Sequence, residues 1–331
     1  MQGQKITLTA LRAAIGIGLV IYLGFSRTIN LRALSGLAVH WPISLAALLL
    51  LLVDVVLLAW RLCLLLSPRG FHLPLGLSFR LTLIGTFFSS CLPGSTGGDV
   101  IKIYYAMEGN QGRRTEVATL LLLDRAVGMF ALLIVPLVMI PAIPQSLVSA
   151  AALKALLLGA SVIALAMLAA ILLCFSLTVR DSQLLSWAFE KLPGGRYAQA
   201  MFSTIHAYRH NLGTLAGALV LSLFTHLLTV AITLLAVWAI DPGTVAWQMC
   251  VLVPIGHLAN SVPLTPGGLG VGEAAFAALF ALAGLRGGAK ALLAWRLLTG
   301  LVSLLGLTYY LQGRRRFVHI VEIPLTVDSG D

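Results

Sequence analysis

Residues 43–66 read ISLAALLLLLVDVVLLAWRLCLLL, an apolar run in which Asp54 and Arg61 are the only charged residues. Because an α-helix rises about 1.5 Å per residue, such a run crosses the roughly 30 Å hydrocarbon core of a bilayer. Similar runs recur along the 331 residues, of which 59% are hydrophobic and only 10% are charged, whereas soluble domains carry about 25% charged residues. The sequence therefore predicts an all-α polytopic membrane protein with a single transmembrane domain over residues 1–331.

Eight hydrophobic segments are expected, and six of them are long enough to span the membrane. The six predicted spans are 8–25, 43–66, 117–140, 154–177, 212–240 and 289–311. The other two segments, 77–107 and 249–283, are interrupted, and their halves are too short to cross comfortably. We predict that each is a re-entrant hairpin. The alternatives are two surface loops, or a plain count of crossings that places Arg113 and Arg114 outside.

The distribution of positive charge predicts the orientation of the chain, because cytoplasmic loops are enriched in Lys and Arg. Arg314–Arg316 predict a cytoplasmic C-terminus, and Lys5 and Arg12 predict a cytoplasmic N-terminus. Both assignments hold only if the first hairpin enters from the cytoplasm and the second from outside. The polar stretch 178–211 is predicted to form two short helices along the cytoplasmic interface.

The two interrupted segments resemble each other in composition. The first has Pro93, Gly94, Gly97 and Gly98 before a carboxylate, and the second has Pro266, Gly267, Gly268 and Gly270. Irregular backbone at membrane depth is tolerated only where protein or a watery cavity surrounds it. Interrupted segments of opposite orientation are typical of inverted-repeat transporters, whose substrate sites lie at the repeat interface. We therefore interpret these eight residues as re-entrant hinges within an inverted repeat.

Nine polar residues in or beside the apolar segments are candidates for substrate binding or translocation. They are Asp54, Arg61, Asp99, Lys102, Asp124, Arg125, Asn260, Glu273 and Arg296. An ionisable side chain at the centre of a span costs at least ~2.5 kcal/mol, so each such group needs a partner or a function. Arginines can hold a phosphate by paired hydrogen bonds, and the carboxylates can offset the arginines or meet a cationic headgroup.

Several of these candidates have a structural alternative. Arg61 shares a helix face with Asp54, seven residues away, but it can instead extend to the interface. Asp99 and Glu273 each follow a glycine-rich break, where a carboxylate can cap a helix N-terminus. Asp124 and Arg125 point about 100° apart on a helix, so each is expected to reach a different neighbour. Arg296 is expected to contact either a lipid phosphate or Glu273.

Three sequence motifs carry a resemblance to a known family. They are PGSTGGDV at 93–100, Asp124-Arg125 in the following span, and PGGLGVGE at 266–273. In this order, and with this hydropathy, they resemble the flippase-like family named for the lysylphosphatidylglycerol synthase transmembrane region. That family includes the N-terminal flippase part of multiple peptide resistance factors. Family members commonly have arginine at the position of Gly272, which puts in doubt the need for a cation beside Glu273.

The resemblance implies a flippase of the bacterial cytoplasmic membrane, moving a phospholipid or a polyprenyl-linked lipid between leaflets. Members that synthesise aminoacylated lipids carry a large soluble aminoacyl-transfer domain after the membrane part, and the sequence here holds the membrane part alone. We therefore expect translocation rather than synthesis. Two alternatives stay open: a subunit that depends on a separately encoded lipid-synthesis partner, and a membrane-embedded lipid-modifying enzyme. A homo-oligomer is compatible with the sequence.

Composition argues against other classes of protein. The formal net charge is +10, but the basic residues lie mostly in loops, as expected beside anionic headgroups. No basic stripe with interleaved aromatic residues indicates nucleic-acid binding. The four cysteines are scattered through apolar runs without zinc spacing, and no Walker A sequence is present. We expect membrane lipids as partners, and no nucleic acid, metal, cofactor or catalytic residue.

Overall fold

The computed structural model describes residues 36–91, 97–108, 110, 112–142, 151–191, 193–240, 247–261, 270–312 and 321–322. Within these ranges, five helices are long and apolar enough to cross a membrane. They are α3 (Trp41–Leu66), α6 (Arg114–Val138), α8 (Ala151–Phe175), α12 (Leu212–Ile240) and α15 (Gly288–Gln312). They coincide with five of the six predicted spans, and the sixth, 8–25, lies outside the described residues. The chain is an all-α polytopic membrane protein.

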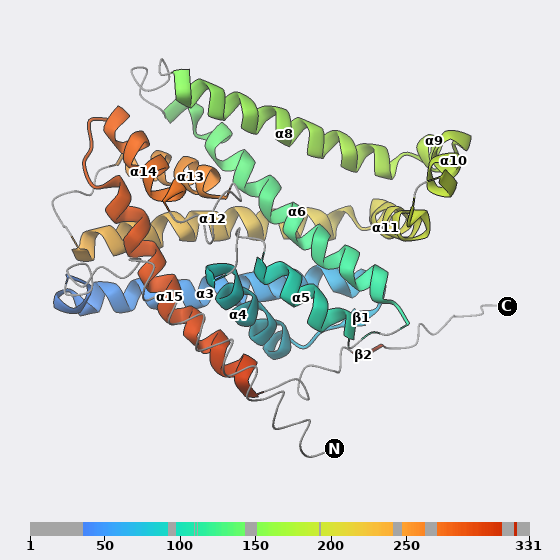
Figure 1. Cartoon of the computed structure of the whole chain (residues 1–331), viewed down its shortest axis with the longest axis horizontal. Helices are drawn as coiled ribbons and strands as arrows, with labels where there is room; N and C mark the ends of the chain where they lie inside the picture. Colours follow the sequence, from blue (N-terminus) through green and yellow to red (C-terminus); the bar gives the residue numbers. More distant parts are fainter. Residues whose placement is uncertain are drawn as a thin grey trace.

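Helices α3 and α12 form the longest packed pair and run antiparallel (Figure 1). His40, which precedes α3, places its Nδ1 2.8 Å from the carbonyl oxygen of Ala239 near the end of α12. The buried face of α3 repeats at every third or fourth residue, as the helical period requires. Its members Ala47, Leu51 and Val55 share one apolar cluster with residues of α12 and α15.

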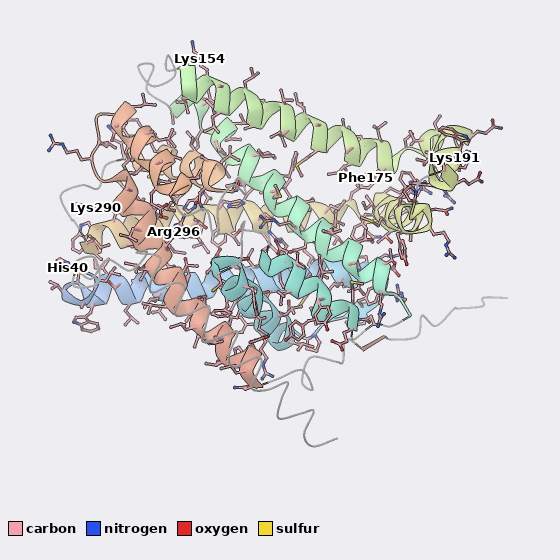
Figure 2. The ribbon with its side chains drawn as sticks, viewed as in Figure 1. His40, Lys154, Phe175, Lys191, Lys290 and Arg296 are labelled. Carbon is pink, nitrogen blue, oxygen red and sulfur yellow. The ribbon has the colours of Figure 1, made fainter. Side chains whose placement is uncertain are left out.

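The molecule has two ends, which are named here by the residues that lie there. His40 and Lys290 mark one end, and Phe175 and Lys191 mark the opposite end (Figure 2). They are called the His40 end and the α11 end. Helix α3 runs from the His40 end to the α11 end, and α12 returns.

The first hairpin consists of α4 (Leu75–Cys91) and α5 (Gly97–Glu108), and it begins and ends at the α11 end (Figure 1). Arg69 lies before α4, and Arg113 lies after α5. Both pair with Glu116 in the first turn of α6, at 2.6 Å from Arg69 Nη2 and 2.7 Å from Arg113 Nε. The two ends of the hairpin are therefore held together by one carboxylate.

The second hairpin consists of α13 (Met249–Asn260) and α14 (Val271–Leu282), and it begins and ends at the His40 end. It follows the end of α12 and leads into the start of α15, where Lys290 lies (Figure 2). The chain therefore repeats one order of elements in opposite directions. A long helix, a hairpin and a second long helix occur as α3, α4–α5, α6 and again as α12, α13–α14, α15.

Of the predicted hinge residues, Pro93, Gly94, Pro266, Gly267 and Gly268 lie outside the described residues. Gly97 and Gly98 open α5, and Gly270 precedes α14 with a φ of 79°, a left-handed conformation that favours glycine. A Cβ on Gly98 would overlap the carbonyl oxygen of Gly85 in α4. The glycine thus allows the two arms of the first hairpin to touch backbone to backbone.

The predicted loop 178–211 contains short helices at the α11 end. They are α9 (Leu177–Arg180), α10 (Gln183–Lys191) and α11 (Gly195–Ala207), followed by the 3-10 turn η3 (Tyr208–His210). The buried Tyr208 hydroxyl donates to the carbonyl oxygen of Leu65 and so attaches this region to the end of α3. A 3-10 turn, η1 (Ser67–Arg69), follows α3, and η2 (Ile140–Ala142) follows α6. Strand β1 (Phe71–His72) pairs antiparallel with β2 (Val321–Glu322).

Candidate functional site

A cavity of about 610 Å³ lies between the two hairpins and the long helices. Its walls come from α3, α4, α5, α6, α12, α13 and α15. Eight of the nine predicted site residues line it: Asp54, Arg61, Asp99, Lys102, Asp124, Arg125, Asn260 and Arg296. The ninth, Glu273, is outside the lining and contacts Arg296. Eight residues between positions 54 and 296 thus line one space although they come from five helices.

Arg61 and Asp124 form a buried ion pair between α3 and α6. The two residues are 6% and 4% exposed. Arg61 Nε lies 2.7 Å from Asp124 Oδ1, Nη2 lies 3.0 Å from Oδ2, and Nη1 donates to Ser222 Oγ on α12 at 2.8 Å. A bidentate pair of this kind fixes the orientation of both groups. Arg61 is therefore buried, and the alternative that it extends to the interface is wrong.

Asp99, in the first turn of α5, connects the first hairpin to α6. Its Oδ1 lies 2.7 Å from Lys102 Nζ within the same helix, and its Oδ2 lies 3.4 Å from Arg125 Nε. The adjacent residues Asp124 and Arg125 thus contact different elements, as their separation around the helix requires. Asp99 also sits where a helix dipole favours a negative charge.

Glu273, in the first turn of α14, connects the second hairpin to α15. Its Oε2 accepts a hydrogen bond of 2.7 Å from the backbone N–H of Gly270, so it caps the helix. Its Oε1 lies 3.2 Å from Arg296 Nε. Capping and pairing with Arg296, which were alternatives in the sequence, therefore occur together. Arg296 Nη2 also donates to Asn260 Oδ1 at 2.8 Å, and Figure 2 places Arg296 between the two ends of the molecule.

Gly272 leaves room for this arrangement. A Cβ at this position would overlap Asn260 Oδ1, which accepts from Arg296. The cation beside Glu273 is therefore supplied from α15, by Arg296, rather than from the adjacent position in the chain.

The two hairpins use the same chemistry. In each, the third residue of the second arm is acidic, Asp99 in α5 and Glu273 in α14. Each acid pairs with an arginine of the long helix that follows, Arg125 in α6 and Arg296 in α15. The repeated order of elements is thus accompanied by a repeated ion pair, one on each side of the cavity.

Sequence reasoning missed several polar residues that line the cavity. Helix α4 contributes Thr82, Thr86, Ser89 and Ser90, and α12 contributes Thr225, His226 and Thr229. The α4 residues recur at helical spacing, so a search for a hydroxyl stripe on an apolar helix would have found them. His257 on α13 also lines this cavity.

The cavity also has apolar residues that face outward. Met129 on α6 and Leu301 and Leu304 on α15 line it and are 38%, 48% and 40% exposed. Helices α6 and α15 are not an extensively packed pair along their described lengths. A residue that both lines a cavity and lies on the outer surface marks its rim. The rim here is apolar, and it lies on the side of the molecule between α6 and α15.

Comparison with known proteins places the chain in one family. None of the curated proteins and none of the solved structures matches it. Over residues 9–306, however, the sequence matches the family described as the lysylphosphatidylglycerol synthase TM region. That range includes both hairpins and every residue of the cavity. The chain belongs to the lysylphosphatidylglycerol synthase TM region family.

Proposed function

We propose that the protein is a lipid translocator that moves an amphiphilic lipid between the leaflets of the bacterial cytoplasmic membrane. The observation that carries the proposal is a charged cavity of about 610 Å³ with an apolar, outward-facing rim between α6 and α15. A charged cavity with an apolar rim suits a lipid with a charged headgroup and apolar chains, such as a phospholipid or a polyprenyl-linked lipid. Family membership supports a role connected with lipids.

Moving a charged headgroup through hydrocarbon is costly, because ions lose their hydration there. A polar cavity replaces part of that hydration with fixed charges and hydroxyl groups. Arg125 and Arg296 suit the headgroup phosphate, since guanidinium groups bind phosphate by paired hydrogen bonds. The acyl chains would meanwhile remain outside the rim formed by Met129, Leu301 and Leu304, within the lipid.

The proposal includes an orientation in the membrane. The α11 end carries Arg69, Arg113, Arg114, Arg180, Lys191, Arg196 and Arg209, whereas the His40 end carries Lys154, Arg286 and Lys290 among the described residues. Positive charge favours the cytoplasmic side, so the α11 end is cytoplasmic. The first hairpin then enters from the cytoplasm and the second from outside, and each turns back within the membrane.

Cysteine accessibility tests this orientation. In a variant without the four native cysteines, Ser186→Cys on α10 should react with a membrane-impermeant thiol reagent only after cells are opened. Arg286→Cys, between α14 and α15, should react in cells whose outer barrier alone is permeabilised. Both side chains are exposed in the structure. The reverse pattern would contradict the orientation, and labelling of both from one side would contradict the odd number of crossings between them.

Leaflet exchange of labelled lipids in liposomes tests the function itself. The panel comprises phosphatidylglycerol, an aminoacylated phospholipid and a polyprenyl phosphate, and protein-free liposomes give the background. We expect one class to exchange faster than background. Arg296→Ala and Glu273→Gln should slow it by about tenfold or more, since an ionic hydrogen bond contributes roughly 1.5–3 kcal/mol. Arg286→Ala, at an exposed arginine, should leave the rate unchanged.

The outcomes separate translocation from its alternatives. If neither Arg296→Ala nor Glu273→Gln alters exchange while both proteins fold, the cavity is not the route. Exchange that appears only with a second protein present would favour a partner-dependent subunit. A new lipid product, detected by mass spectrometry after incubation with a lipid donor, would favour an enzyme.

A further inference from the structure

One acidic residue of the cavity differs from the others. Asp99 pairs with Lys102 and Arg125, Asp124 pairs with Arg61, and Glu273 pairs with Arg296. Asp54 forms none of these ion pairs. Its Oδ1 is shielded from solvent and has no hydrogen-bond partner in the structure. An acidic oxygen in this situation is stable when it binds a proton or a cation.

Arg61 does not satisfy Asp54 by hydrogen bonding, although the two share a helix face. Arg61 Nε and Nη2 are bound by Asp124, and Nη1 is bound by Ser222. Asp54 lies near the middle of α3, roughly 20 Å from its first residue at about 1.5 Å per residue. It is therefore remote from the water at either end of the helix, and it lines the cavity.

A second polar group of the same cavity also lacks a partner. His257, on α13, is 9% exposed, and its Nε2 has no hydrogen-bond partner. Its ring packs against Trp295 and Phe276, with centroids 4.7 and 5.4 Å away, yet the residue lines the cavity. Two titratable residues that line the cavity, from different halves of the chain, thus each have a polar atom without a hydrogen-bond partner.

The remaining charges around Asp54 determine what its protonation does. Of the helices packed against α3, α6 contributes Asp124 and Arg125, α12 contributes His226, and α15 contributes Arg296. The polar side chains with which the described part of α4 lines the cavity are all hydroxyl groups. Helix α5, across the cavity, contributes Asp99 and Lys102. With Glu273 included, four acidic side chains face four cationic ones. Protonation of Asp54 would leave one positive charge without a counter-charge.

We propose that Asp54 binds a proton together with an anionic lipid headgroup, so that the proton and the lipid cross the membrane together. This coupling rests on the proposed lipid translocation. The carboxylate gains a proton on one side and forms an O–H bond, which breaks when the proton is released on the other. The protonated cavity attracts a phosphate, and by reciprocity a bound phosphate favours the protonated carboxyl.

A pH gradient across proteoliposomes tests the coupling. The vesicles are phosphatidylcholine with a trace of fluorescent phosphatidylglycerol or polyprenyl phosphate, and the label in the outer leaflet is measured by chemical quenching. Cotransport predicts accumulation in the leaflet that faces the more alkaline compartment. With one proton per lipid, a gradient of one pH unit shifts the leaflet ratio by up to about tenfold. A proton ionophore should abolish the shift, and protein-free vesicles give the background.

Two matched variants identify the group. Asp54→Asn should bring the label to equal amounts in both leaflets under the same gradient, because the amide cannot take up the proton. Asp181→Asn makes the same change at an exposed carboxylate on the α11 end and should accumulate lipid like the wild type. Asp54→Glu, which keeps an ionisable group, should retain a shift and serves where Asp54→Asn does not fold.

The outcomes distinguish this inference from the proposed function. Four outcomes would overturn the coupling and leave translocation intact. They are lipid exchange without accumulation, accumulation on the acidic side, exchange of zwitterionic lipids alone, and accumulation by folded Asp54→Asn. Absence of exchange for every lipid would overturn translocation. Infrared difference spectra of the detergent-solubilised protein then decide whether Asp54 binds a proton. A protonated-carboxyl C=O band should vanish as the pH rises and shift in Asp54→Glu, and an unshifted or absent band overturns the site.

Discussion

At the scale of single residues, ion pairs connect the helices around the cavity. Arg61 and Asp124 are almost completely buried, and each takes the other as its main partner. Breaking a buried pair by removing one member typically costs 3–5 kcal/mol, because it leaves the other charge uncompensated. Asp54 has no such partner, so the same chemical change there removes an unfavourable group. The two aspartates should therefore respond in opposite ways to replacement by asparagine.

Thermal unfolding in detergent checks this contrast. Asp124→Asn should lower the stability by about 3 kcal/mol or more, because Arg61 loses its counter-charge within a protein interior. Asp54→Asn should be neutral or stabilising, and Asp181→Asn, at an exposed site, should stay within about 0.5 kcal/mol of the wild type. Equal destabilisation by Asp124→Asn and Asp54→Asn would contradict this assignment of the partners.

At the scale of elements, long spans were predictable and their contacts were not. Hydropathy is a local property, so helices such as α3 and α12 follow from 20 or so consecutive residues. The pairing of Asp124 with Arg61 joins residues 63 apart, and no local pattern specifies it. The same limit applies to Glu273, whose double role depends on how α14 meets α15. The hydroxyl stripe of α4 carried a periodic signal that sequence reasoning missed.

The close approach of α4 and α5 gives a prediction at this scale. A Cβ at Gly98 would overlap the Gly85 carbonyl oxygen, a backbone atom that cannot move away by a change of rotamer. Gly98→Ala should therefore destabilise the protein by about 1–3 kcal/mol, the usual cost of overpacking. Gly159→Ala, on α8 where nothing lies within 4 Å of a new Cβ, serves as the control. It should be neutral or slightly stabilising in thermal unfolding, because alanine favours a helix. A neutral Gly98→Ala would contradict the observed packing.

At the scale of the whole molecule, the two halves present equivalent parts to one cavity. Asp99 with Arg125 and Glu273 with Arg296 lie at the inner ends of hairpins that come from opposite ends of the molecule. In inverted-repeat transporters, one repeat moves relative to the other around a fixed substrate site, and the movement exposes that site to alternate sides of the membrane. The long helices that follow the hairpins, α6 and α15, carry the apolar rim, so the proposed lipid route to the charges runs between them.

Passage of lipid across this rim gives the last prediction. Leu304 and its neighbour Leu305 on α15 are similarly exposed, at 40% and 44%, but only Leu304 lines the cavity. Leu304→Trp places a large ring at the rim and should slow lipid exchange in liposomes several-fold. Leu305→Trp adds the same ring about 100° around the helix, toward the surrounding lipid, and should leave exchange unchanged. Both substitutions keep an apolar surface, so neither is expected to alter thermal stability by more than about 0.5 kcal/mol. Equal exchange rates for the two variants would mean that the lipid reaches the charged cavity by a route other than the gap between α6 and α15.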